Sequence, residues 1–138
     1  MERGTLRLEI ITPDAVVYDE DVLMVTMPCV TGQLGVYPMH VPLITQIVPG
    51  ELIAQHPDGR DRFLAVGEGL VDIGADRVSI ATDMAIPQER IDEARAEEAR
   101  QRAAARLEEK LSDEEVAAVN ASLVRSLAQL RVKRRGHH

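Results

Sequence analysis

The sequence has few aromatic residues and a single cysteine, and each shortage excludes a class of function or structure. Its only aromatic residues are Phe63, Tyr18 and Tyr37, so it offers no broad stacking surface for bases or sugars. The lone Cys29 excludes an internal disulfide and is typical of a reducing compartment. No apolar run approaches the roughly 20 residues of a membrane span, and the first residues do not resemble a signal peptide. We therefore expect a soluble, intracellular protein without direct membrane insertion.

Glycine and proline are missing from most of the second half of the chain. All 7 prolines lie at or before Pro87, and of the 9 glycines only Gly136 lies beyond it. Residues 88–135 are instead rich in Ala, Glu, Arg and Leu, which favour helix. We predict a β-rich head (residues 1–87), a helical regulatory tail (88–135), and residues 136–138 as a disordered end or the remnant of a tag.

The net charge of −7 is unevenly distributed. Residues 1–88 carry 5 Lys and Arg against 13 Asp and Glu, whereas residues 89–138 carry 11 against 10. An acidic head would repel phosphate, which argues against nucleic acid as a partner. A basic segment near the end comprises Arg131, Lys133, Arg134 and Arg135. It either complements the dipole at the C-terminal end of a helix or binds a phosphate-rich or acidic partner.

The head contains short apolar segments separated by turn signals. Residues 6–10 alternate apolar and polar side chains, which is typical of a half-buried strand. Further candidate strands cover 16–18, 22–27, 51–54, 62–66, 69–73 and 77–81, with turns at 56–59 and 74–76. No segment before residue 88 is long enough for a crossover helix. The pattern predicts an antiparallel β-sandwich or barrel.

The tail shows two helical stripes separated by a capping signal. Pro87 is expected in the first turn of the first helix. Residues 112–115 (Ser-Asp-Glu-Glu) predict a capping box that starts a second helix, so the two helices form an antiparallel hairpin. The apolar stripes are Ala96, Ala99, Ala103, Leu107 and Leu111, then Val116, Val119, Leu123, Leu127 and Leu130. The first stripe is mostly methyl groups, so the hairpin is either a static flap or a weakly held mobile element.

No pattern of catalytic residues or metal ligands stands out. His40 lies between Pro38 and Pro42, where a histidine that holds its loop is the simpler interpretation, and Cys29 is expected to be buried and inert. Nothing resembles a nucleophile elbow, a zinc motif or an acidic metal loop, so we expect neither catalysis nor a metal site.

One charged constellation has two interpretations. Asp92 and Arg95 are three residues apart, as in an intrahelical ion pair. Alternatively, Arg95 joins Arg102 and Arg125 in a cationic cleft for a triphosphate.

Five segments together resemble a known family. Residues 32–45, 48–51, 66–73, 91–96 and 128–132 occur in family order and closely resemble the epsilon subunit of bacterial F-type ATP synthases. The resemblance implies a ten-stranded β-sandwich followed by a two-helix hairpin. It also implies a non-catalytic rotor subunit, peripheral at the cytoplasmic face of the cell membrane, that joins the gamma subunit to the c-ring of a proton-translocating enzyme. The hairpin would extend along gamma to the alpha and beta subunits and inhibit ATP hydrolysis, which would make the basic segment inhibitory.

The resemblance also implies two sites. The loop at 32–43 would face the c-ring through Gln33, Met39 and His40, although the family usually has Gly at position 39 and often Glu at 33. Some members bind ATP on the folded hairpin, which here would use Ile91, Asp92, Arg95, Ala96, Arg102 and Arg125. Gln129 stands where such members can carry another arginine. No cofactor is required, and ATP would be a regulatory ligand. The leading rival is a free-standing nucleotide-sensing module.

Overall fold

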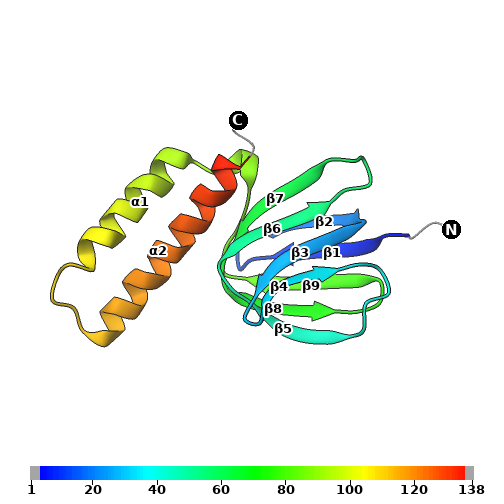
Figure 1. Ribbon diagram of the computed structural model, residues 1–138, viewed down its shortest axis with the longest axis horizontal. Coiled ribbons are helices and arrows are strands. Elements are labelled where there is room, and N and C mark those ends of the chain that lie inside the picture. Colours follow the sequence, from blue (N-terminus) through cyan, green and yellow to red (C-terminus); the bar gives the residue numbers. More distant parts are fainter. Residues whose placement is uncertain (1–3, 136–138) are drawn as a thin grey trace.

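A computed structural model describes residues 4–135 as a ten-stranded sheet followed by two helices (Figure 1). The strands are β1 (Leu6–Ile11), β2 (Val16–Val22), β3 (Met24–Cys29), β4 (Gly32–Val36), β5 (Leu43–Ile47), β6 (Gly50–Gln55), β7 (Asp61–Val66), β8 (Gly69–Ile73), β9 (Arg77–Thr82) and β10 (Ala85–Pro87). A 3-10 turn η1 (Gln88–Arg90) leads to α1 (Glu93–Arg106) and α2 (Asp113–Arg134). The predicted β-sandwich with a C-terminal helical hairpin is confirmed. The expectation for residues 136–138 lies outside the described residues.

The sheet is nearly closed and contains one exception to antiparallel pairing. Its strand order is β10-β7-β6-β3-β5-β8-β9-β1-β2, with β4 paired to β3. Strands β1 and β9 are parallel, in register from Arg7↔Arg77 to Ile11↔Ala81, whereas the other strand pairs are antiparallel, as predicted. Parallel strands need a long connection, and here the intervening strands supply it in place of a helix. His56, which follows β6, lies 3.5 Å from Glu20 of β2, so β2 at one end of the strand order returns close to β6, the third strand from the other end.

The core of the head follows from period-2 alternation. Leu6, Leu8 and Ile10 of β1 are buried, while the residues between them are exposed or half-buried. The same alternation places Leu52 and Ala54 of β6 in this core. Aliphatic side chains fill the space between the layers, which explains how a chain with three aromatic residues still builds a dry interior.

Three strands were not predicted, and each lacks a clear alternation. β4 contains Gly32 and Gly35, which obscure its pattern. β5 begins with two exposed apolar residues, Leu43 and Ile44. β10 has only three residues and pairs only with β7. Pro87 ends this edge strand, where its missing N–H is tolerated, so its expected place in the first helical turn was wrong.

Helix α1 begins later and ends earlier than the sequence suggested. It starts at Glu93 with Asp92 as N-cap and ends at Arg106, so Leu107 and Leu111 belong to the connection. The capping box of α2 is confirmed. Ser112 Oγ accepts from the Glu115 N–H at 3.2 Å, and Glu115 Oε1 accepts from the Ser112 N–H at 3.2 Å. These reciprocal bonds satisfy two backbone donors that the start of a helix leaves open.

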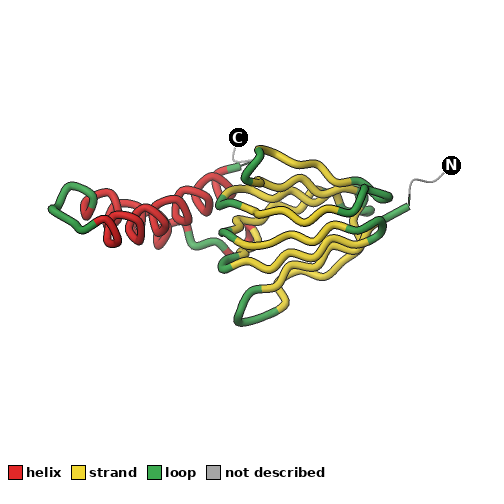
Figure 2. Tube along the Cα trace, turned by 90° about the horizontal axis from the view of Figure 1, so that it is seen from below, coloured by secondary structure: helices red, strands yellow, loops and turns green. Residues whose placement is uncertain are grey.

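The hairpin projects from one end of the sandwich and contacts it mainly through the last turns of α2 (Figures 1 and 2). Val132 is buried there with Ala65 of β7 and Ile91 of the linker that leads to α1, and Ala128 and Leu130 are also buried on this part of α2. Leu127 is 45% exposed, contrary to its place in the predicted stripe. Helix α2 faces α1 on one side and the sheet on another, so a single stripe could not describe its burial.

Candidate functional site

The loop between β4 and β5 presents an exposed apolar tip. Met39 is 79% exposed and has a φ of 71°, a left-handed conformation that is strained for a side chain of this size. Its backbone N–H donates to the Ala75 carbonyl, which anchors the loop to the β8–β9 turn. The positive φ gives a physical reason for the glycine that the resemblance leads us to expect at this position.

His40 and Gln33 differ in how firmly they are held. The His40 Nδ1–H donates to the Val41 carbonyl at 2.6 Å, so this imidazole braces its own loop. Gln33 lies exposed on β4, opposite Pro28 of β3. Beside His40, the apolar side chains of Val41 and Ile44 are 74% and 72% exposed. This loop therefore offers apolar contact more than charge.

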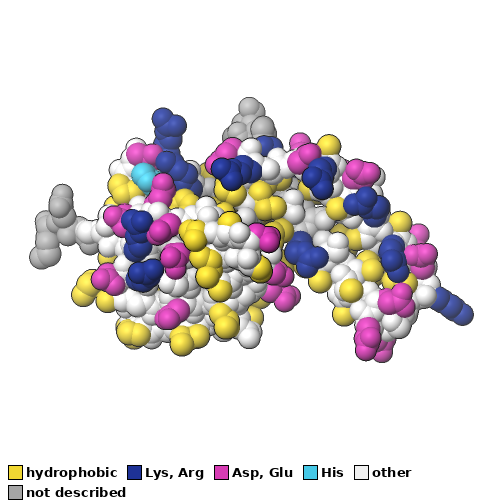
Figure 3. All heavy atoms as spheres, turned by 180° about the vertical axis from the view of Figure 1, so that it is seen from behind, with side chains coloured by type: hydrophobic (Ala, Val, Ile, Leu, Met, Phe, Trp, Pro, Cys, Tyr) yellow, Lys and Arg dark blue, Asp and Glu magenta, His cyan; other side chains and the backbone are white. Residues whose placement is uncertain are grey.

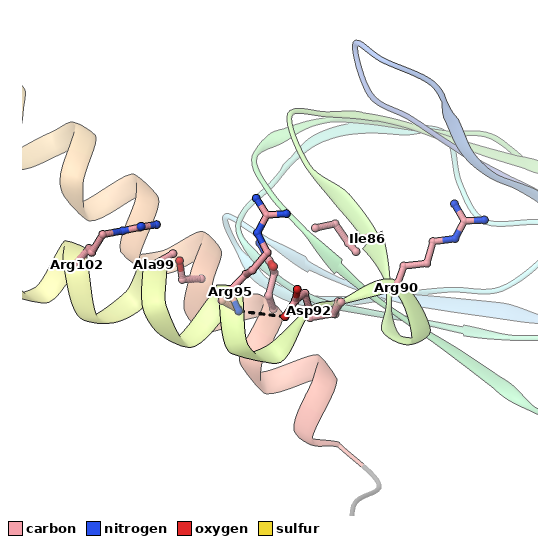
Figure 4. A pocket seen from close by; sticks show the side chains of 10 residues that line it. Ile86, Arg90, Asp92, Arg95, Ala99 and Arg102 are labelled. Carbon is pink, nitrogen blue, oxygen red and sulfur yellow. Dashed lines mark hydrogen bonds between the residues drawn. The ribbon is translucent and has the colours of Figure 1, made fainter.

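A cavity of about 370 Å³ lies where α1 begins against α2 and β10. This is within the usual range for small-molecule pockets, roughly 300–1,000 Å³. Its lining consists of Ile86, Arg90, Ile91, Asp92, Arg95, Ala96, Ala99, Arg102, Ser126 and Gln129 (Figure 4). Every residue that the resemblance suggested for ATP lines it except Arg125. The sequence reasoning did not assign Ile86, Arg90, Ala99 or Ser126 to this site.

Asp92 has a different role from the predicted ion pair. Its Oδ1 accepts from the backbone N–H of Arg95 at 3.1 Å, so Asp92 caps α1 (Figure 4). Within the described residues the guanidinium groups of Arg95 and Arg102 have no carboxylate partner. In Figure 4 the Arg90 side chain points away from Arg95. Arg95 lies in the first turn of α1, beside the positive end of its dipole, and Arg102 lies about two turns farther along the same helix. Two unneutralised arginines that line one cavity can attract a chain of phosphates.

The basic segment at the end of α2 is largely engaged. Lys133 Nζ donates to the Gln88 carbonyl at 3.2 Å. Arg134 Nε donates to Glu93 at 2.9 Å, and its Nη2 donates to Glu97 at 3.2 Å. Arg135 donates to both carboxylate oxygens of Glu51, at 2.6 and 2.7 Å. Arg131 alone of the segment is exposed without an ion pair in the described part of the chain.

The carboxylate of Glu97, which accepts from Arg134, is held in the ionised form. Hydrogen bonding to Arg100, with a smaller contribution from Arg134, lowers the pKa of Glu97 to about 2. Hydrogen bonding to Glu51 raises the pKa of Arg135 above its ordinary value. By contrast, burial raises the pKa of the Cys29 thiol, which agrees with the inert role expected for it.

Among residues 4–135, no helix is long and apolar enough to cross a bilayer.

Viewed from behind, positive and negative side chains are mixed along the hairpin, while apolar groups gather on parts of the head (Figure 3). This mixture agrees with the near balance of charge in residues 89–138. On the face seen in Figure 3, the hairpin therefore shows no large field of one sign.

Comparison with known proteins matches both halves of the chain. Residues 5–88 match the family described as ATP synthase, Delta/Epsilon chain, beta-sandwich domain, and residues 89–134 match its long alpha-helix domain. The ATP synthase epsilon chain of Laribacter hongkongensis is 36% identical, over 97% of this chain and 99% of that one. The epsilon chain of Moorella thermoacetica is 39% identical, over 93% and 96%. A chain of the Euglena gracilis mitochondrial ATP synthase shares the fold, with a TM-score of 0.79 at 22% identity, over 93% of this chain and 80% of that one.

Proposed function

The chain belongs to the ATP synthase delta/epsilon family, as an epsilon chain, and we propose that it is a non-catalytic part of the central stalk of a bacterial enzyme. In this role the head joins the gamma subunit to the c-ring of a proton-translocating synthase, at the cytoplasmic face of the membrane. The observation that carries the proposal is the co-linear match of both domains to epsilon chains over nearly the whole length. Co-purification of the untagged chain with a membrane-bound ATPase tests it, since a free-standing module would purify alone.

The apolar tip of the β4–β5 loop is the proposed contact with the c-ring. Two variants, Met39→Asp and His40→Ala, should weaken proton pumping. Met39→Asp places a charge on the apolar tip, and His40→Ala removes the hydrogen bond to the Val41 carbonyl. ATP hydrolysis by the detached catalytic sector is the control and should not change. Normal proton pumping in inverted vesicles for both variants would remove this loop from the interface.

The hairpin is the proposed inhibitor of ATP hydrolysis, in an extended form that reaches the alpha and beta subunits. Support comes from its seam, in which α1 buries only Ala96 and Ala103. Because few side-chain atoms hold the helices together, the free-energy gap to an extended form should be a few kcal/mol. ATP hydrolysis by the assembled enzyme should rise when residues 88–135 are deleted. Unchanged hydrolysis would contradict the inhibitory role.

The basic segment is proposed to attract acidic groups of the catalytic subunits when the hairpin extends. Lys133, Arg134 and Arg135 also hold the folded hairpin, so neutralising them would weaken both states. Arg131 has no such second role in the described structure. Arg131→Gln should therefore raise hydrolysis without loosening the folded hairpin, and an unchanged rate would exclude Arg131 from the inhibitory contact.

ATP is the proposed regulatory ligand of the folded hairpin, bound in the cavity beside Arg95 and Arg102. Because both helices line this cavity, bound ATP would stabilise the folded form by mass action. Calorimetry on the whole chain should show binding that Arg95→Ala and Arg102→Ala abolish. Arg125→Ala is a matched control, since Arg125 does not line the cavity. The proposal would be contradicted if calorimetry detected no binding heat at millimolar ATP. It would also be contradicted if Arg125→Ala lost ATP binding as Arg95→Ala is expected to do.

A further inference from the structure

Glu51 is an acidic residue on an apolar face of the head. On β6 its neighbours Leu52 and Ala54 face the core, so Glu51 points to the outer face, beneath the hairpin. Phe63 and Ala65 of β7 lie on this same apolar face. The Glu51 residue is only 4% exposed and is the one buried charged residue of the described chain. A carboxylate in this position requires a positive partner when the hairpin is in place.

Arg135 supplies that partner from the end of α2. Its Nε and Nη2 donate to the two carboxylate oxygens of Glu51, in the two-pronged geometry that makes such pairs strong. Its guanidinium also lies 5.1 Å from the centre of the Phe63 ring. Gln88 of the linker donates to the carbonyls of Val132 and Arg135 at 2.8 and 3.0 Å, which fixes the end of the helix.

The other ion pairs of the hairpin cannot hold it to the head. Arg134 joins α2 to Glu93 and Glu97 of α1, and Arg106 contacts Glu109 and Glu115, so these contacts travel with the hairpin. In the described chain only Arg135–Glu51 forms an ion pair across the boundary between hairpin and head. We propose that this pair is the latch that keeps the hairpin docked. The proposal deepens the function above, since it concerns the equilibrium between the docked and extended hairpin.

The two partners of the latch should not be equivalent. Arg135 has a side chain that is 44% exposed, so water can solvate it if Glu51 is replaced. Glu51 is covered in the docked state and reaches water only when the hairpin leaves. Removal of Arg135 therefore strands a buried charge in the docked state alone. Consequently, Arg135→Gln should open the hairpin more than Glu51→Gln, and Glu51→Gln should restore docking to an Arg135→Gln chain.

Amide hydrogen exchange on the full chain tests the latch. In Arg135→Gln the protection of residues 93–134 should fall by about tenfold or more, the effect expected for a stranded charge, while the strands of the head keep theirs. Glu51→Gln should lower protection less, and the double variant should recover most of it. Arg131→Gln serves as the matched control, because it removes an arginine on α2 without an ion pair.

Three results would overturn the latch. In the first, Arg135→Gln exchanges its amides as slowly as Arg131→Gln. In the second, the double variant is less protected than Arg135→Gln, and in the third, the head of Arg135→Gln loses as much protection as the hairpin. Hydrolysis by the assembled enzyme separates the two proposals. If Glu51→Gln, which weakens the latch and leaves the basic segment intact, opens the hairpin without changing ATP hydrolysis, the latch stands and the inhibitory role of the hairpin fails.

Discussion

The head and the hairpin are held together by different means. Large aliphatic side chains such as Leu8, Ile10 and Leu52 are completely buried between the layers of the head. The seam between the helices uses alanine and serine, and a cavity of about 310 Å³ remains there, lined partly by Ala103 and Val119. Burial therefore stabilises the head, whereas polar contacts at one end of α2 position the hairpin. We therefore expect that the hairpin can move without unfolding the head.

The largest expected difference is between two leucine truncations. Leu8→Ala in the head removes a fully buried side chain and should lower the free energy of unfolding by about 2–5 kcal/mol. Leu127→Ala on α2 removes a side chain that is 45% exposed and should cost under about 1 kcal/mol. Urea denaturation of both variants measures the comparison. Equal losses would show that the hairpin is packed as firmly as the head.

Removal of the helix cap should affect the hairpin alone. Ser112→Ala breaks the capping box at the start of α2 and should destabilise that helix by about 1 kcal/mol. The start of α2 lies at the turn farthest from the head, so amide exchange should accelerate there first (Figure 1). Ser79→Ala, on β9, is the control for loss of a hydroxyl in the head. Faster exchange throughout the strands of Ser112→Ala would mean that hairpin and head unfold together.

Relief of backbone strain should make the head more stable. Met39→Gly removes the cost of a positive φ at an exposed position, where little buried surface is lost. We expect a gain of at most about 1 kcal/mol, because glycine also gains freedom in the unfolded chain. Thermal melting measures it. Met39→Ala keeps the strain and should not show the gain, so a similar rise in both variants would contradict the explanation.

Acid should weaken the hairpin modestly. The pKa of Glu97 is about 2 in the folded chain against an ordinary value of 4.5, and hydrogen bonding to Arg100 is the main cause. The lowered pKa means that its stabilising effect is full above pH 4.5 and is lost as the pH falls through about 2. Amide exchange of residues 93–106 between pH 5 and pH 2 should show the loss, and Glu97→Gln should reduce it. Asp58 of the head titrates over the same range, so this variant is needed to separate the two.

Local pattern accounted for most of the fold. Alternation located β1, where every second residue enters the core, and residues 112–115 located the start of α2 by capping chemistry. The pattern failed at β4 and β5, whose glycines and exposed apolar residues give no alternation. It also failed at Pro87, because an edge strand and a first helical turn tolerate a missing N–H equally well.

The candidate sites were predictable only in part. The segment at 91–96 identified one wall of the cavity, since its residues are neighbours in the sequence. Arg125 does not line the cavity, while Ser126 and Gln129 do, because the rotation of α2 depends on both of its packing faces. Glu51 gave no signal, since one glutamate in an apolar strand is consistent with an ordinary exposed position.

The sequence by itself determined which residues become strand and helix, because side-chain alternation, capping and turn residues act over a few positions. It also determined the uneven charge and, through its motifs, the family. Only the tertiary structure decided that Arg135 meets Glu51, 84 residues earlier, and that three of the four basic residues are already engaged. Such pairings depend on where the end of α2 reaches the outer face of the sheet, and this is fixed by the packing of the whole chain.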